Sequence, residues 1–181
     1  MEFAMGYPQR LQGLVMIGVT FFAPGYYEWG WSKVSRWFSW FSGKFTPLAT
    51  ETLMQRYFSP DTMNTKADLV EAFRDHVANR MASENVQAFM TALESREDLW
   101  KPLERDELPD RKHNGLPDAL IIYGSHSHDV DGAENGFIRF NPAKLSRIQV
   151  WGCGDMVHEE MPDKVARPII LFLEGLGILF R

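Results

Sequence analysis

Cysteine is nearly absent from this chain, which has one cysteine, Cys153, in 181 residues. A single cysteine cannot form an internal disulfide, and that composition fits a reducing compartment. The net charge is −5 and no basic cluster occurs, which argues against binding to nucleic-acid phosphates. No apolar run reaches the ~20 residues of a membrane-spanning helix, and the first residues lack the positive charge of a secretory signal. We therefore expect a cytoplasmic protein with no nucleic-acid partner and no membrane span.

Three short apolar runs predict buried strands, at residues 14–19, 119–123 and 147–151. The first two runs are continuous rather than alternating, which is typical of parallel strands that are covered on both faces. Hydrophobic residues make up 45% of the chain, enough to build a packed core around them.

Helices are predicted between the first two runs. Aromatic residues recur at helical spacing over residues 27–45, and a shorter helix is predicted around residues 53–58. Thr65 followed by Asp68 predicts the start of a third helix with Leu69, Val70, Phe73 and Val77 on its buried face. Ser83 predicts another start, before an inward stripe of Val86, Met90 and Leu93. Burial is the simplest explanation of each stripe, because periodicity reports only burial.

The last predicted helix begins at Met161-Pro162-Asp163, because proline is favoured at the first helical position. Pro168 should kink this helix or delay its start. The order of strand, block of helices, strand, helix, strand and helix indicates an α/β fold with a parallel sheet. We expect the core at residues 1–24 and 101–181, and a helical cap insertion at residues 25–100.

Several stretches in order along the chain resemble the N-myc downstream-regulated (NDRG) family. They are Tyr7-Pro8-Gln9-Arg10-Leu11-Gln12-Gly13, Ala23-Pro24-Gly25-Tyr26-Tyr27-Glu28-Trp29, Ser95-Arg96-Glu97-Asp98-Leu99, Gly152-Cys153-Gly154 with Met161-Pro162, and Leu173-Glu174-Gly175-Leu176-Gly177. The resemblance implies the last three strands of a non-catalytic α/β-hydrolase fold with its flanking helices and cap.

Hydrolysis on this fold needs a serine in Gly-x-Ser-x-Gly, then an acid and a histidine. No Gly-x-Ser-x-Gly occurs in the chain. The resemblance places Ser127 at the position of the acid and Asp155 at the position of the histidine. A carboxylate lacks the near-neutral pKa with which imidazole takes and returns a proton. We therefore predict a degenerate hydrolase that has no catalytic residues.

Other residues are weaker candidates for chemistry. His158 lies one helical turn from Asp155 and could supply a histidine, with Asp129 as its acid, but a polar group at a loop–helix junction is the simpler interpretation. His126, His128, Asp129 and Asp131 could chelate a metal if they converged, although a solvated loop is the expected structure. Cys153 is expected to be a buried, inert thiol. We predict no metal and no cofactor.

Only three strands of a fold with about eight are expected here, so the first strand should have an unpaired edge that invites self-association. We interpret the chain as a truncated product or a fragment, which should be unstable, oligomeric or molten when it is expressed alone.

The resemblance implies a non-enzymatic cytoplasmic factor in signalling, stress response or differentiation that acts through protein contacts. Trp29, Trp31, Ser127, Asp155 and His158 are the candidate binding residues. Two alternatives remain open. One is the C-terminal part of a divergent, esterase-like hydrolase whose nucleophile lies in a missing N-terminal half. The other is a small-molecule binder that uses the former substrate pocket.

Overall fold

The computed structural model describes residues 2–19, 21, 47–82, 84–85, 88, 91–92, 95, 116–138 and 140–179. The chain divides into two compact units, residues 1–21 with 99–181 and residues 22–98. The aromatic helix expected at residues 27–45 lies outside the described residues. Of the helix expected after Ser83, residues 84–85, 88 and 91–92 are described and are helical, whereas its predicted inward residues Val86, Met90 and Leu93 lie outside the described residues. That the second unit forms a cap stays a prediction.

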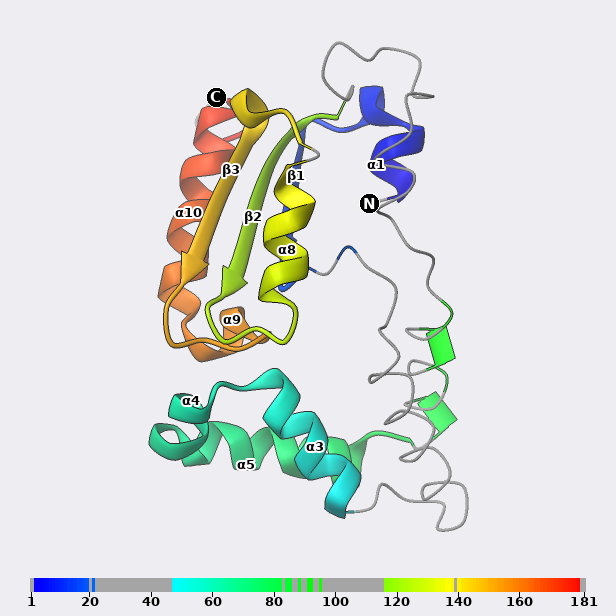
Figure 1. Ribbon diagram of the computed structural model, residues 1–181, viewed down its shortest axis with the longest axis vertical. Coiled ribbons are helices and arrows are strands. Elements are labelled where there is room, and N and C mark those ends of the chain that lie inside the picture. Colours follow the sequence, from blue (N-terminus) through cyan, green and yellow to red (C-terminus); the bar gives the residue numbers. More distant parts are fainter. Residues whose placement is uncertain are drawn as a thin grey trace. The chain divides into compact units, whose positions relative to one another are not determined.

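A parallel sheet of three strands, in the order β1-β2-β3, forms the centre of the first unit (Figure 1). Its strands are β1 (Gly13–Ile17), β2 (Asp118–Gly124) and β3 (Leu145–Val150). All three predicted strands are confirmed, with ends that differ by one or two residues. Coverage on both faces is confirmed for β2, which is buried from residue 119 to 124. Strand β1 also packs against the core clusters on both faces, but it is only half-buried throughout. Within the described residues β1 pairs on one side only, which leaves it less covered.

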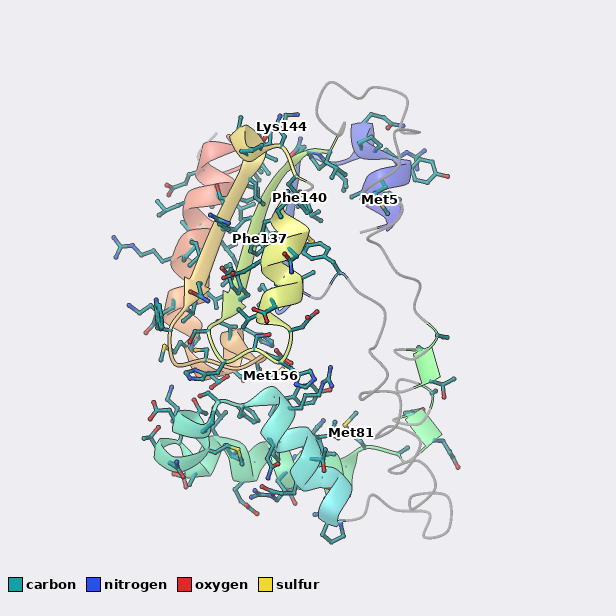
Figure 2. The ribbon with its side chains drawn as sticks, in the orientation of Figure 1. Met5, Met81, Phe137, Phe140, Lys144 and Met156 are labelled. Carbon is teal, nitrogen blue, oxygen red and sulfur yellow. The ribbon has the colours of Figure 1, made fainter. Side chains whose placement is uncertain are left out.

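Helices cover both faces of this sheet (Figure 1). Helix α8 (Val130–Phe137) packs Ala133 and Phe137 against Ile121 and Tyr123 on one face (Figure 2). On the other face, α9 (Val157–Glu160) and α10 (Pro162–Gly175) pack against β2 residues Leu120 and Ile122. Successive side chains of a strand point to opposite faces, which explains why neighbouring residues of β2 belong to different core clusters.

Helix α10 begins at Pro162, as the sequence predicts. Pro168 lies inside the helix and does not delay its start. Proline has no amide hydrogen, so the Lys164 carbonyl loses its usual partner four residues later. The helix nevertheless continues past Pro168. Val165 is buried at 4% exposure, and Ile169 and Phe172 pack against the sheet.

The described part of the second unit is helical, with α3 (Pro47–Tyr57), α4 (Pro60–Thr65), α5 (Ala67–Asp75) and a π-helical turn, η2 (His76–Arg80). The short helix predicted around residues 53–58 is part of α3, which begins six residues earlier and ends at Tyr57. Met54 and Phe58 are buried. The start assigned to Thr65 is wrong, because this residue ends α4 and its hydroxyl donates to the Asp61 carbonyl at 2.8 Å. Helix α5 begins two residues later, at Ala67, without a side-chain cap.

Shorter elements complete the described chain. They are α1 (Glu2–Gly6) and the 3₁₀ turns η1 (Pro8–Arg10) and η3 (Pro142–Lys144). Ala4 of α1 is buried in the same core cluster as Phe137, so the N-terminal helix belongs to the α8 side of the sheet.

Candidate functional site

The chain segments that leave the three strands meet at their carboxyl ends, the edge at which open α/β sheets bind ligands. The Gly18 amide donates a hydrogen bond to the Ile122 carbonyl at 3.0 Å, so the chain that leaves β1 runs beside β2. Gly18 has a φ of +59°, and a Cβ atom there would lie 2.6 Å from the Asp155 carbonyl oxygen. Glycine is therefore required at this position both for its backbone conformation and for space.

Ser127 and Asp155, which the resemblance assigned to the acid and histidine positions, are in direct contact. The Ser127 hydroxyl donates a hydrogen bond to Asp155 Oδ1, and the His128 amide donates to the same oxygen at 3.0 Å. Both side chains are half-buried. One carboxylate oxygen thus joins the loop after β2 to the loop after β3. We call Ser127, His128 and Asp155 the loop clasp.

Backbone hydrogen bonds hold the two loops together behind the clasp. The Ser125 amide donates to the Val150 carbonyl at 3.0 Å, and the His126 amide donates to the Cys153 carbonyl at 2.8 Å. The Ser125 hydroxyl accepts from the Gly152 amide at 2.9 Å. Cys153 is fully buried, consistent with the expected buried thiol.

Glu160 is a site residue that the sequence analysis missed. Its side chain is fully buried on α9, and its Oε1 accepts from the Gly154 amide at 2.6 Å. Buried acidic residues are rare unless they are hydrogen-bonded. Glu160 therefore fixes the loop that carries Asp155. The only signal in the sequence was a carboxylate six residues after a Gly-x-Gly turn, which is too weak to predict this contact.

The remaining candidates do not gather at the loop clasp. His158 is exposed on α9, where its Nε2 lies 4.0 Å from Glu159 Oε1. The carboxylate of Asp129 lies against Gly132 in the first turn of α8. Trp29 and Trp31 lie outside the described residues. Among the residues described, no three His, Cys, Asp or Glu side chains converge on a metal-sized site.

Tyr123, on the face of the sheet that α8 covers, has a shifted pKa. Burial raises the pKa of Tyr123, and the Glu134 carboxylate, whose Oε1 accepts the phenol's hydrogen bond at 3.4 Å, raises it further. Tyr123 is therefore neutral at physiological pH and acts as a packing residue rather than as a base.

Comparison with known proteins decides the family. The protein-family model described as "Ndr family" matches residues 1–180 of this chain. The chain belongs to the Ndr family. Protein NDRG3 of Xenopus laevis is 27% identical over 180 residues, which cover 98% of this chain and 46% of that protein. Protein NDL1 of Arabidopsis thaliana is 28% identical over 180 residues, covering 97% of this chain and 49% of that protein. This Ndr-family chain thus spans about half the length of the curated relatives it matches.

Solved structures confirm the α/β-hydrolase fold of this Ndr-family chain. A thermophilic esterase from Thermogutta terrifontis aligns with a TM-score of 0.76 at 17% identity, over 96% of this chain and 60% of that one. The enol-lactonase from Burkholderia xenovorans LB400 aligns with a TM-score of 0.73 at 14% identity, over 95% and 60%. Identities this low establish the fold and not the chemistry. In the described part of the chain, no helix has the length and apolar character needed to cross a bilayer.

Proposed function

We propose that this chain is part of a non-enzymatic NDRG-like protein, a cytoplasmic factor in signalling, stress response or differentiation that acts through protein contacts. The supporting observation is the loop clasp, in which a hydroxyl and a carboxylate meet where the resemblance places an acid and an imidazole. The relay of a serine hydrolase needs imidazole as its base and a carboxylate to orient that base.

The chemistry of the clasp argues against such a relay. Asp155 Oδ1 already accepts two hydrogens, from the Ser127 hydroxyl and the His128 amide. Those contacts fix the carboxylate as a link between loops. An aliphatic hydroxyl in place of the acid cannot stabilise an imidazolium, and a carboxylate in place of the histidine cannot serve as a near-neutral base.

The alternative function is a divergent, esterase-like hydrolase with its nucleophile in another part of a longer protein and with His158 and Asp129 recruited. The exposed position of His158 on α9 leaves its imidazole accessible, which favours this alternative. Its contact is with Glu159, however, and the Asp129 carboxylate lies against Gly132, so neither group is oriented toward the other by a described contact.

An esterase assay on the purified full-length protein separates the two functions. With p-nitrophenyl acetate as substrate, we expect the unmodified protein to show the same turnover as His76→Ala. That variant removes another exposed histidine and controls for nonspecific hydrolysis by surface imidazole. Turnover that disappears in His158→Ala and persists in His76→Ala would overturn the proposal. The double variant Ser127→Asp with Asp155→His tests whether restoring an acid and an imidazole to these loops confers any activity.

A further inference from the structure

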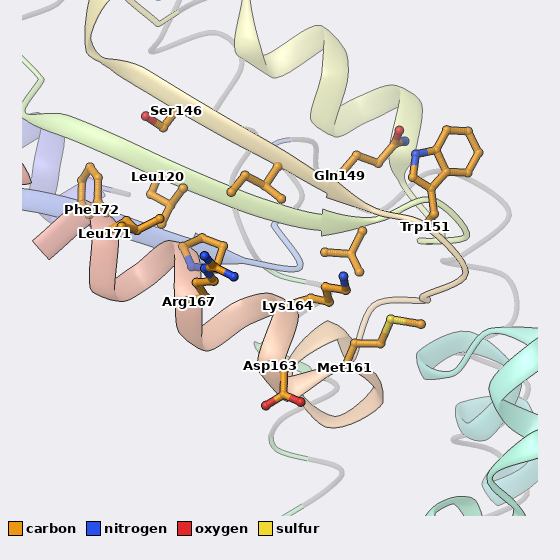
Figure 3. Close-up of a pocket in the computed structure, with 13 residues that line it drawn as sticks. Leu120, Ser146, Gln149, Trp151, Met161, Asp163, Lys164, Arg167, Leu171 and Phe172 are labelled. Atoms are coloured by element: carbon orange, nitrogen blue, oxygen red, sulfur yellow. The ribbon is translucent and has the colours of Figure 1, made fainter.

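The free side of β3 borders an open groove against α10, with a volume of about 700 Å³ (Figure 3). Ile148, Val150 and Phe172 form part of its apolar lining. Trp151 follows the last residue of β3 and is 77% exposed. An exposed tryptophan beside an apolar groove is a common anchor for a protein partner.

The backbone of β3 is also available along this groove. Within the described residues β3 pairs with β2 alone, so its opposite side carries no ladder. The Val150 carbonyl accepts from the Ser125 amide and thus points toward β2. Backbone groups alternate in direction along a strand, which places those of Arg147 and Gln149 on the free side. These groups can pair with an added strand.

Two of the three charged residues that line the groove are cations. Lys164 and Arg167 line it from α10, and neither has an ion-pair partner among the residues that the structure describes. Lys164 points toward the strands, whereas Asp163 points away from them (Figure 3). Arg147 of β3 does not line the groove, because its guanidinium carbon lies 5.7 Å from the centre of the Phe137 ring on the α8 face of the sheet.

We propose that this groove binds an extended, acidic segment of a partner protein, which adds as a strand to the free side of β3. The inference rests on the proposed function and deepens it by naming the surface and the partner's chemistry. Acidic side chains of the added strand would meet Lys164 and Arg167, and apolar ones would meet Trp151. A second copy of this chain fits less well, because pairing β3 with itself would align the same cations of both copies along one seam.

The test uses the full chain and a short fluorescein-labelled peptide in which glutamate alternates with valine, followed by fluorescence anisotropy. We expect saturable binding that weakens with salt. Charge reversal in Lys164→Glu with Arg167→Glu should weaken it by about tenfold or more. Arg80→Glu, at a 72% exposed side chain on the other unit, reverses one charge; it is the control for each single reversal, Lys164→Glu or Arg167→Glu, and should leave the affinity unchanged.

Two further peptides separate strand addition from simple charge attraction. Replacing each glutamate with lysine should abolish binding. Methylating alternate backbone amides keeps the charge but removes the hydrogens that a strand must donate, and it should also abolish binding. Equal binding of the methylated peptide, equal binding to the charge-reversed variant, no binding of the acidic peptide, or self-association of the chain through β3 would each overturn the inference. The esterase assay is independent, so a failure here leaves the non-enzymatic proposal standing.

Discussion

Removing the Asp155 carboxylate should loosen the junction of the β2 and β3 loops. Its Oδ1 accepts one hydrogen from the Ser127 hydroxyl and one from the His128 amide. Hydrogen bonds to a charged group contribute about 1.5–3 kcal/mol each, and exposure to water reduces that figure. Because Asp155 is half-buried, we assign about 1 kcal/mol to each bond. Asp155→Ala should therefore lower the free energy of unfolding by about 2 kcal/mol.

Companion substitutions divide this loss between the two bonds. Ser127→Ala removes only the hydroxyl donor and should cost about 1 kcal/mol. Asp155→Asn keeps an oxygen that can accept from the His128 amide and should cost less than Asp155→Ala. The double variant Ser127→Ala with Asp155→Ala should be less destabilising than the sum of the single variants, because both remove the same bond.

Thermal denaturation measured by circular dichroism provides the assay. For a chain of this size, about 2 kcal/mol corresponds to a fall in Tm of about 4–8 °C. Asp118→Ala is the matched control, since this aspartate is exposed at the start of β2, and its Tm should not change. Hydrogen exchange at the His128 amide should accelerate in Asp155→Ala but not in Asp118→Ala, because only the first removes the acceptor of this amide. An unchanged Tm, unchanged exchange, or full additivity of the single variants would refute the reasoning.

Substitutions at three other residues test the surroundings of the clasp. Gly124→Ala would place a Cβ atom against the Gly154 carbonyl and should lower the urea midpoint by an amount equivalent to about 2 kcal/mol, because backbone cannot move aside cheaply. Glu160→Ala should cost about 3 kcal/mol by removing the acceptor of the Gly154 amide in a buried site, and Glu160→Gln should cost less in the same titration. The raised pKa of Tyr123 favours the neutral phenol in the folded state, so its contribution is complete below about pH 10 and is lost as pH rises through the raised pKa. The alkaline fall in Tm should therefore be smaller in Tyr123→Phe than in the unmodified chain.

The strands and the last helix were predictable because each rests on a local signal. A continuous apolar run marks β2, which is buried on both faces, and Pro162 marks the start of α10. The half-burial of β1 was not predictable, since burial depends on what lies beside a strand and not on its own residues.

The start of α4 shows a local signal that competed with another. Ser59 is fully buried, its Oγ accepts from the Thr62 amide at 3.1 Å, and Pro60 follows at the first helical position. Serine followed by proline is a helix-start pattern. The prediction placed the start at Thr65 because the apolar stripe of α5 follows this residue. The Thr65 hydroxyl instead donates to the Asp61 carbonyl within α4.

The site was predictable in its positions but not in its contacts. The resemblance located Ser127 and Asp155 in the loops after the second and third strands. That one accepts a hydrogen from the other depends on loop paths separated by 28 residues, which no local pattern encodes. The burial of Glu160 was hidden for a similar reason, because a carboxylate is expected at the surface until its buried donor, the Gly154 amide, is known.

The contact between Ser127 and Asp155 also determines how the restoration experiment can be read. Substituting both residues, Ser127→Asp with Asp155→His, moves the carboxylate to the β2 loop and sets an imidazole on the β3 loop. A carboxylate can accept a hydrogen bond from an imidazole N–H, so a side-chain link between the loops can persist while its chemistry changes. If the double variant folds with an unchanged Tm but hydrolyses nothing, the lack of activity would be due to the missing nucleophile rather than to the two loops. A restored pair that unfolds would show instead that the arrangement of hydroxyl and carboxylate has become part of the structure.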